Sequence, residues 1–570
     1  MRASGVLLPV SSLSSKYGIG CFSKEAYRFI DYLKKYGQSY WQILPLGQTS
    51  YGDSPYQSFS TFAGNPYFIS LEKLVQKGLL KKKECDACDF GKEPAYVDYG
   101  RMYKARYKLL KEAFSHFDQS EREFVTFQKE QQWLSDYALF MALKDHFKGK
   151  SWVEWPEDIR IRKPQAMEEY QEKLSKEMAF YMYVQYEFFS QWKELKAYAN
   201  EQGIQIIGDI PIYVALDSSD AWASPELFQF DKDRKPTAVA GCPPDGFSAT
   251  GQLWGNPLYD WDYHEKTNYA WWVKRVAACY EMYDVIRIDH FRGFDEYYAI
   301  PAGDKTAENG KWKKGPGIGL FDALKKELGD LNIIVEDLGY ITDTVREMVR
   351  ACGFPNMKVL EFAFDARDSS GPSDYLPYNY DKNCVVYTGT HDNETLRGWL
   401  ESVPSAAYGQ IERYLGRKIK DKDEMTREII RMAQASAANL CIIPIQDYLV
   451  LDNTARMNQP STIGANWKWR LLPDQLDSET GLWMKQLTKT YGRLAKAHKT
   501  AEAKEDADGK GLSTDEKQVA PADKTEAADK AKAAGETKSA DGKHSGVSEG
   551  SKDKIQEMRE HREKVKKNRG

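Results

Sequence analysis

Residues 269–289 read YAWWVKRVAACYEMYDVIRID, and this stretch shows the pattern that decides the fold. We predict a helix over residues 269–283 and a strand over residues 285–288. The strand is short and mainly apolar, which is typical of a strand buried on both faces of a parallel sheet. A carboxylate, Asp289, follows the strand directly.

The same order of a helix and then a short apolar strand recurs along the chain. The predicted pairs are 24–36 with 40–44, 178–199 with 204–207, 320–328 with 333–335, and 342–352 with 357–364. Two further strands are predicted at residues 5–10 and 384–387. Alternating helices and buried strands require a parallel sheet with both faces covered. Repeated this often, they indicate an α/β protein with a closed (β/α)8 TIM barrel.

Two regions depart from this pattern. Residues 65–175 are rich in predicted helix, with residues 123–147 as the clearest element, and we interpret them as a helical insertion. Residues 498–570 are charged, of low complexity and poor in large apolar side chains, so they bury too little surface to offset the entropy of ordering. We therefore predict a barrel domain over residues 1–497 and a disordered tail over residues 498–570. The tail is either an interaction arm or a neutral extension.

Composition and charge argue against several classes of protein. A formal net charge of -4 and a pI of ≈ 6.2 give no electrostatic reason to bind nucleic acid or an anionic membrane. No apolar run is long enough to span a membrane, and the first residues lack a full-length signal-peptide core, so we expect a cytoplasmic protein. Cys85 and Cys88 form a lone C-x-x-C pair without a partner pair at zinc spacing, which argues against a metal site. The 15 Trp and 35 Tyr residues fit either a large aromatic core or sugar binding.

Carboxylates follow the predicted strands at the point where each strand ends. They are Asp209 after residues 204–207, Asp289 after 285–288, Glu336 after 333–335, and Asp392 a few residues after 384–387. The carboxyl ends of barrel strands share one rim, where such folds place their active sites. Any one of these residues could instead cap the next helix. Four of them on separate strands favour an active site.

Paired carboxylates suit the chemistry of glycosidic bonds. A retaining glycosyl transfer needs one carboxylate as nucleophile and a second, protonated carboxyl group that releases the leaving oxygen. Arg287 precedes Asp289 by two residues and so shares a face of the strand with it. Its guanidinium can hold Asp289 in the ionised form.

Several segments resemble one family closely. The segments are GDIPIYV at 208–214, RIDHFR at 287–292, VEDLG at 335–339, THDN at 390–393, YGDSPYQ at 51–57, WKKGPG at 312–317, NWKWR at 466–470, and the Gly- and Pro-rich run at 243–259. They resemble the signature regions and the mobile active-site loop of the 4-α-glucanotransferases, the amylomaltase and disproportionating-enzyme branch of the α-amylase-like barrels. The resemblance covers residues 1–497. The chain departs from the family pattern at Gly246, Glu361, where glutamine is expected, and Ser461, none of which is a catalytic group.

The resemblance implies a role for each matching residue. Asp289 is expected to be the nucleophile, Glu336 the general acid and then base, and Asp392 the group that holds the sugar hydroxyls beside the reacting carbon. The expected substrate-binding residues are Arg287 and Asp209 around the nucleophile, His290 and His391 on the sugar, Asn393 beside them, Tyr51, Asp53, Ser54 and Tyr56 along the glucan path, and Phe247, Gln252 and Trp254 from the loop.

The resemblance also implies the reaction. A segment of an α-1,4-glucan is transferred to the 4-position of another glucan or of glucose, with maltooligosaccharides, starch and glycogen as partners. No cofactor is expected, because protein carboxylates suffice for this chemistry, and no calcium-loop motif is present. Two alternatives stay open. One is an α-amylase-like hydrolase, and the other is a non-catalytic glucan-binding protein, against which the intact Asp289, Glu336 and Asp392 count.

Overall fold

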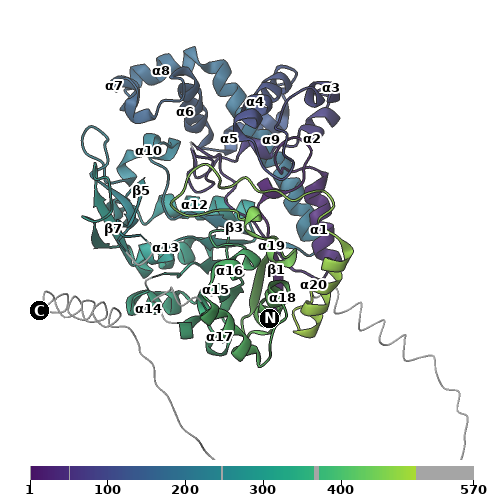
Figure 1. Cartoon of the computed structure of the whole chain (residues 1–570). Helices are drawn as coiled ribbons and strands as arrows, with labels where there is room; N and C mark the ends of the chain where they lie inside the picture. Colours follow the sequence, from purple (N-terminus) through teal and green to yellow (C-terminus); the bar gives the residue numbers. More distant parts are fainter. Residues whose placement is uncertain (1, 51, 245–247, 340, 365–371, 496–570) are drawn as a thin grey trace, which may run out of the picture. The chain divides into compact units, whose positions relative to one another are not determined.

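Eight parallel strands close into a barrel in the part of the chain that the structure describes (Figure 1). The structure is a computed structural model and describes residues 2–495 except 51, 245–247, 340 and 365–371. The strands, in order around the barrel, are β1 (Ala3–Leu7), β2 (Tyr40–Gln42), β3 (Gln205–Ile210), β6 (Val285–Ile288), β9 (Ile333–Val335), β10 (Asn356–Val359), β11 (Cys384–Tyr387) and β12 (Leu440–Pro444). β12 pairs with β1 and closes the ring, with Leu440 opposite Ala3. The predicted (β/α)8 barrel is confirmed.

Each barrel strand sends its side chains alternately into two cores. The core inside the barrel consists of Leu7, Ile207, Val285, Ile334, Met357, Val359, Val385, Tyr387 and Ile442. Neighbouring residues of the same strands, such as Ile206, Ile286 and Val386, belong to the larger core between strands and helices. Because both faces are buried, these strands read as apolar runs without polar alternation.

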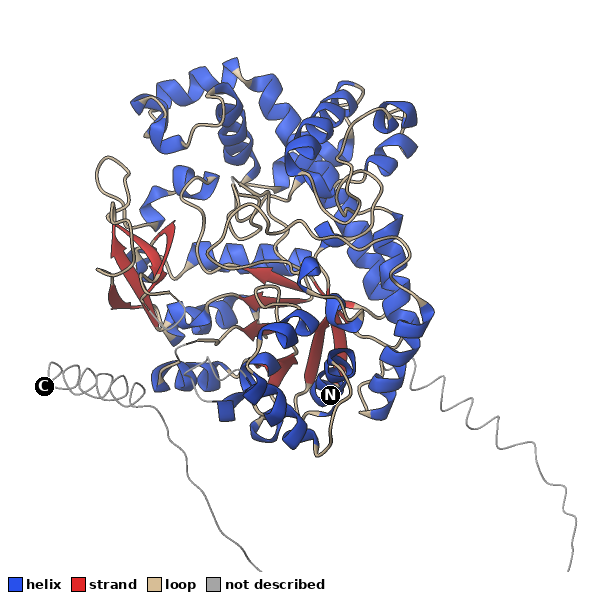
Figure 2. Ribbon diagram, in the orientation of Figure 1, coloured by secondary structure: helices blue, strands red, loops and turns tan. Residues whose placement is uncertain are grey.

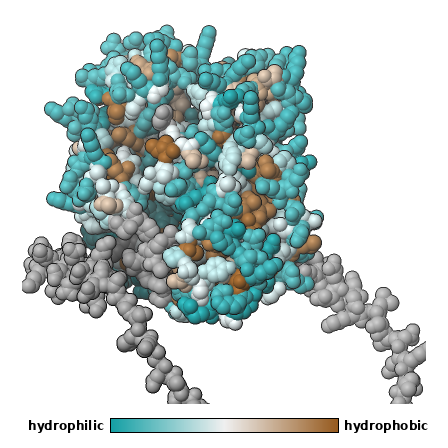
Figure 3. Space-filling model, in the orientation of Figure 1, coloured by the Kyte–Doolittle hydropathy of each residue, from teal (hydrophilic) through white to brown (hydrophobic). Residues whose placement is uncertain are grey.

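Helices cover the outside of the barrel (Figure 2). Five of them match the predicted helices to within three residues at each end: α1 (Lys24–Lys35), α9 (Ser175–Glu201), α12 (Ala270–Met282), α13 (Ile318–Leu328) and α14 (Asp343–Cys352). The later part of the described chain adds α16 (Leu396–Ser402), α17 (Ser405–Leu415), α18 (Lys422–Ala435), α19 (Ile445–Tyr448) and α20 (Ser478–Thr490). No helix among the described residues combines the length and apolar character needed to cross a membrane. The face drawn in Figure 3 is mostly hydrophilic, with apolar side chains in small separate groups.

Residues 65–175 form a group of helices that lies at the top of the view in Figure 1. They are α2 (Leu71–Gln76), α3 (Lys82–Asp86), α4 (Tyr99–Ser115), α5 (Arg122–Glu130), α6 (Leu134–His146), α7 (Glu157–Arg160) and α8 (Pro164–Lys173). The prediction of one element over residues 123–147 is wrong, because α5 ends at Glu130 and α6 begins at Leu134. Gln131 leaves the helical region with φ -88 and ψ 88, and its side chain accepts a hydrogen bond from the Trp133 indole. The apolar spacing continues through this break, so periodicity alone does not reveal it.

A four-stranded antiparallel sheet, which the sequence pattern does not predict, lies beside the barrel. Its strands, in order, are β5 (Gln252–Pro257), β4 (Ala238–Cys242), β7 (Glu296–Pro301) and β8 (Lys311–Lys314). β5 carries Gly and Pro, and β8 is mostly Lys, so neither has the composition of a typical strand. β5 pairs with the preceding β4 and β8 with the preceding β7, and the long-range pairing of β4 with β7 joins the two hairpins.

Two strand predictions need correction, besides the one over residues 5–10, where the strand is Ala3–Leu7. The strand predicted over residues 357–364 ends at Val359, and the rest is a short helix, α15 (Leu360–Phe364). β12 is absent from the predicted set, although its residues Leu440–Pro444 are as apolar as the others. A short buried apolar run has no periodicity that separates strand from helix, which explains both errors. The tail predicted over residues 498–570 lies outside the described residues.

Candidate active site

Asp289 and Glu336 lie at the ends of two neighbouring barrel strands. Ile288, the last residue of β6, pairs with Val335, the last residue of β9. The N–H of Asp289 donates to the Ile210 carbonyl at 3.0 Å, and the N–H of Glu336 donates to the Ile288 carbonyl at 3.0 Å. Both residues therefore continue the ladder by one step, and neighbouring strands lie about 4.8 Å apart. The register brings the two carboxyl groups to one place on the rim.

Arg287 connects the nucleophile candidate to a third carboxylate. In the register between β3 and β6, Arg287 lies directly opposite Asp209. Its Nη1 donates to Asp209 Oδ2 at 2.6 Å and to Asp289 Oδ1 at 3.2 Å. Burial opposes the charge of Arg287, but Asp209 and Asp289 outweigh it and raise the pKa well above the usual value. Arg287 therefore stays charged.

The two carboxyl groups differ in their affinity for a proton. Burial raises the pKa of Asp289 to about 6, while the Arg287 guanidinium acts to lower it. Burial raises the pKa of Glu336 to about 8, and the negative charge of Asp289 adds to the effect. Near neutral pH, this environment favours an ionised Asp289 beside a protonated Glu336. Acid and base catalysis by two carboxyl groups requires one ionised and one protonated group in this way.

The backbone after Asp289 holds Glu336 in place. The N–H of His290 donates to Glu336 Oε2 at 2.6 Å, and the N–H of Leu338 donates to Oε1 at 3.1 Å. His290 has φ 50, in the left-handed region that residues other than glycine rarely adopt. Burial lowers the pKa of His290 to about 3, so its imidazole is neutral. Its ring meets the Trp254 ring edge to face, with centroids 4.9 Å apart.

Asp392 lies in the turn that follows β11 and is held from two sides. His391 Nε2 lies 3.3 Å from Asp392 Oδ2, and the Asn458 amide donates to Oδ1 at 2.6 Å. Burial opposes ionisation, but His391 and Asn458 outweigh it and hold the pKa of Asp392 well below its usual range. Asp392 is therefore a permanent anion and a hydrogen-bond acceptor.

Tyr56 joins the Asp209 side of the site to the Asp392 side. Its hydroxyl donates to Asp209 Oδ2 at 2.9 Å and lies 2.8 Å from His391 Nε2. Since the phenol has one proton and gives it to Asp209, His391 donates to Tyr56 through Nε2. The two rings lie nearly parallel, with centroids 5.3 Å apart. Burial raises the pKa of Tyr56 well above its usual value and keeps the phenol neutral.

The remaining predicted site residues lie at the edges of this cluster. Gln252 Oε1 accepts from the Trp254 indole at 3.1 Å, so both belong to the wall that faces His290. Ser54 Oγ accepts from the Tyr56 N–H at 3.3 Å. Asp53 lines a small cavity together with Tyr99 and Trp467. Asn393 Oδ1 accepts from both the N–H and the hydroxyl of Thr390 at 2.9 Å. Tyr51, Phe247 and the departure at Gly246 lie outside the described residues.

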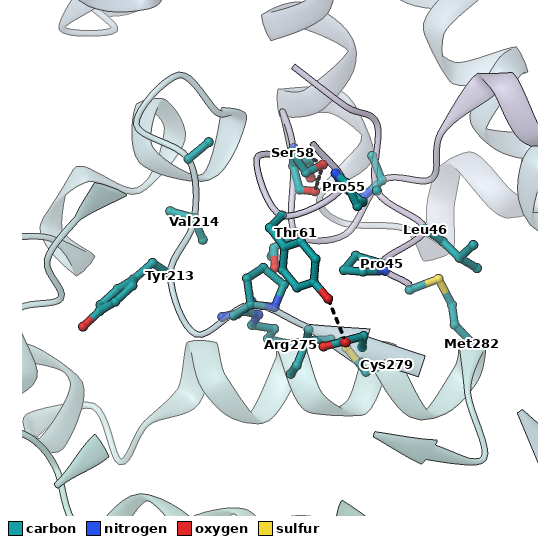
Figure 4. Close-up of a pocket in the computed structure, with 18 of the residues that line it drawn as sticks. Pro45, Leu46, Pro55, Ser58, Thr61, Tyr213, Val214, Arg275, Cys279 and Met282 are labelled. Atoms are coloured by element: carbon teal, nitrogen blue, oxygen red, sulfur yellow. Dashed lines mark hydrogen bonds between the residues drawn. The ribbon is translucent and has the colours of Figure 1, made fainter. Parts of the chain in front are cut away.

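A cavity of about 40 Å³ is lined by Asp209 and Tyr56 but not by the other three carboxylates. Figure 4 shows Arg275, Cys279 and Met282 along one wall, on α12, with Tyr213 and Val214 farther round. A water molecule needs roughly 10–15 Å³ of such space, so the cavity fits a few waters and is too small for a glucose unit. It is therefore a cavity beneath the site and not the sugar-binding site.

The sequence pattern does not identify three residues that support the carboxylates. Asn458 and Arg456 both donate to Asp392, and Arg456 Nη2 does so to its carbonyl at 2.9 Å. The Trp467 ring lies 5.9 Å from Tyr56 and 6.0 Å from His391, on a backbone with φ 65. Trp467 falls in a segment that resembles the family, and that resemblance could have identified it from the sequence. Asn458 and Arg456 lie in an irregular segment with no pattern that could identify them. Among the described residues, no group of three or more His, Cys, Asp or Glu side chains could hold a metal ion.

Comparisons with known proteins agree on one family. Residues 8–475 match the family described as 4-alpha-glucanotransferase. The 4-alpha-glucanotransferase of Clostridium butyricum is 50% identical over 489 residues, which are 85% of this chain and 99% of the relative. The chloroplastic/amyloplastic 4-alpha-glucanotransferase of Solanum tuberosum is 40% identical and covers 86% of this chain and 87% of its own length. The amylomaltase from Streptococcus agalactiae, solved in complex with acarbose, is 42% identical with a TM-score of 0.84 and covers 87% of this chain and 100% of that chain.

Proposed function

This chain belongs to the 4-alpha-glucanotransferase family, and on that premise we propose that Asp289 and Glu336 carry out its transfer reaction as nucleophile and as acid and base. The chain is thus an enzyme that moves segments of α-1,4-glucans. The observation that carries the proposal is the register between Ile288 and Val335, because Asp289 and Glu336 are the next residues on these two neighbouring strands. Their different affinities for a proton support the two roles.

In the first step, the Asp289 carboxylate attacks the anomeric carbon of the donor glucan. The bond to the glycosidic oxygen breaks, and Glu336 gives its proton to that oxygen, so the leaving glucan departs with a new 4-hydroxyl group. A covalent glycosyl ester on Asp289 results. Arg287 supports this step because it keeps the partly buried attacking group ionised.

In the second step, an acceptor 4-hydroxyl group attacks the same carbon. Glu336, now a carboxylate, takes the proton of that hydroxyl, and the bond to Asp289 breaks. Two inversions restore the α configuration. The N–H groups of His290 and Leu338 hold the Glu336 carboxylate during the interval in which it is charged.

Asp392 and His391 bind hydroxyl groups of the sugar at the reacting position in this proposal. Asp392 is anionic throughout, and its strongest hydrogen bonds form with donors such as sugar hydroxyls. Trp254 and His290 form an aromatic edge beside the carboxylate pair, where a sugar ring can pack on an apolar face.

Transfer requires that a sugar hydroxyl, and not water, resolves the ester. The loop over residues 243–259 is the part of the chain that can cover the bound glucan and exclude water, and β5 fixes its second half against β4. We further propose maltooligosaccharides, starch and glycogen as substrates. The similar amylomaltase bound to acarbose supports this class of ligand. Cytoplasmic location is part of the proposal, and the eight free cysteines are in keeping with a reducing compartment.

Incubation with maltotriose as the only sugar tests the proposed reaction. The wild type should produce glucose together with maltopentaose and longer chains, which chromatography by chain length resolves over time. Maltose and glucose with nothing longer would mean that water wins the second step, in favour of a hydrolase. No product at all would favour a non-catalytic glucan-binding protein.

Variants of the two carboxyl groups test the residue assignment. Asp289→Asn and Glu336→Gln should lower kcat by several orders of magnitude while the proteins stay folded. Asp220→Asn is a matched control, because burial also raises the pKa of Asp220 to about 6, but Asp220 accepts from the Thr61 N–H away from the carboxylate pair. The control should retain kcat. An Asp289→Asn variant with full activity would refute the assignment.

A further inference from the structure

Glu361 is a buried carboxyl group next to the candidate site that the proposed mechanism does not use. It lies in α15, directly after β10, and is 3% exposed. Its N–H donates to the Thr388 carbonyl at 3.1 Å, and its Oε1 has no hydrogen-bond partner among the described residues. A Cβ atom placed on Gly389 would lie 2.7 Å from this oxygen. The carboxyl group thus packs directly against the backbone that leads to Asp392.

The groups that face Glu361 disfavour a negative charge on it. Burial raises the pKa of Glu361 well above its usual range, and the Asp447 and Glu394 carboxyl groups raise it further. Arg456 and the Asn393 side chain act in the opposite direction.

The two neighbouring carboxyl groups, those of Asp447 and Glu394, each accept a hydrogen bond from a side chain other than Glu361. Asp447 accepts from the Thr388 hydroxyl at 2.5 Å, and Glu394 accepts from the Asn453 amide at 2.7 Å. Burial raises the pKa of Asp447 to about 6, so it is ionised above neutral pH. A negative charge on Glu361 would be repelled by the carboxyl groups of Asp447 and Glu394.

Arg456 is already committed to the segment that holds Asp392. Its Nε donates to the Asn458 carbonyl at 2.8 Å, and its Nη2 donates to the Asp392 carbonyl at 2.9 Å. The Asn458 amide then holds the Asp392 carboxylate at 2.6 Å. Movement of Arg456 would therefore disturb Asp392 through both its backbone and its side chain.

We propose that Glu361, in its neutral form, is a positioning residue that leaves Arg456 free to hold Asp392. When Glu361 ionises, it attracts Arg456 and is repelled by Asp447 and Glu394, and the turn that carries Asp392 shifts. The enzyme thereby loses activity at alkaline pH for a reason separate from its general acid. The inference rests on the proposed role of Asp392.

An activated donor separates this effect from the ionisation of Glu336. Fluoride leaves α-maltosyl fluoride without a proton from Glu336, so kcat/KM for fluoride release no longer requires the general acid. The wild type and Glu361→Gln should therefore have equal kcat/KM near neutral pH. Once alkaline pH ionises Glu361, the wild type should fall by about tenfold per pH unit, and Glu361→Gln should not.

Two more variants complete the experiment. Glu394→Gln removes a charge that opposes ionisation of Glu361, so the alkaline loss should move to lower pH. Glu187→Gln is the control, because Glu187, on α9, is also buried but pairs with Lys77, and its pH profile should match the wild type.

The inference is overturned if Glu361→Gln keeps the alkaline loss of the wild type, or loses the same factor at every pH. If Glu361→Gln does not fold, the Glu394→Gln profile decides, and an unmoved profile overturns the inference. Failure of the proposed function looks different, since the wild type would then release no fluoride and form no transfer product at neutral pH.

Discussion

Replacing Arg287 by methionine would leave two carboxylates face to face at the centre of the site. Arg287 is 2% exposed and donates to Asp209 at 2.6 Å and to Asp289 at 3.2 Å. Methionine is long, flexible and uncharged, so the change removes the guanidinium and keeps much of the packing. The variant isolates what the positive charge does for Asp289.

The structure sets the size of two effects. Removing one partner of a buried ion pair costs about 3–5 kcal/mol of unfolding free energy. A hydrogen bond to a charged group contributes about 1.5–3 kcal/mol, and about 1.36 kcal/mol corresponds to one pKa unit. The pKa of Asp289, now about 6, should therefore rise by about 1–2 units. Because the proposed nucleophile must be ionised, kcat/KM on the acidic side should fall by about 10-fold to 100-fold.

The assay is kcat/KM for glucose release from maltotriose across pH, with urea unfolding measured in parallel. The acidic limb of Arg287→Met should move to higher pH by about 1–2 units. Arg275→Met is the matched control, since Arg275 is a buried arginine that donates to the Ile212 carbonyl at 3.0 Å and not to the carboxylate cluster. It should lose stability and keep its acidic limb. An Arg287→Met profile that is lowered uniformly, with the limb unmoved, would refute this reasoning.

Three further predictions follow from the same contacts. Tyr56→Phe removes the hydroxyl that bridges Asp209 and His391, and kcat/KM should fall by about 10-fold to 100-fold with little change in Tm. A large fall in Tm together with the loss of kcat/KM would indicate a purely structural role. Asn458→Ala removes a 2.6 Å hydrogen bond from Asp392, so kcat/KM should fall by about tenfold or more, and unchanged kinetics would count against support of Asp392 from this side. Glu336→Gln should raise Tm relative to the wild type, and by more at pH 9 than at pH 5. In the folded protein the pKa of Glu336 is about 8, well above its value in the unfolded chain, so the stability of the wild type declines as pH rises between these two values. An equal Tm difference at pH 5 and pH 9 would contradict the claim that burial raises this pKa.

Local sequence patterns predict the elements that are regular and buried on both faces. β6, β9 and β11 begin and end at the predicted residues, because each is a short apolar run bounded by polar residues. The same criterion fails at Leu360–Phe364, where an equally apolar run is a helix. It also fails for β8, whose lysines form a strand only because β7 pairs with it. Periodicity reports how a segment is buried, whereas strand pairing depends on a partner outside that segment.

The sequence predicts some parts of the candidate site and not others. The positions of Asp289, Glu336 and Asp392 just after predicted strands identify them from the sequence, and the structure brings all three to one rim. The contacts that support them are invisible to local patterns. Tyr56 and His391 are 335 residues apart in the chain, and Asn458 and Asp392 are 66 apart.

Neighbouring residues and the fixed geometry of a strand are enough to predict the barrel, the types of reactive group, the strands that deliver them and the support of Asp289 by Arg287. The proton on Glu336 depends on burial and on a charge from another strand, which local patterns do not reveal. Asp289 lies against Arg287 and is pushed toward ionisation, whereas Glu336 lies beside the negative charge of Asp289 and is pushed the other way. Burial raises the pKa of both groups, and the charge of Asp289 acts on Glu336 across two neighbouring strands, whereas the Arg287–Asp289 pair lies within one strand.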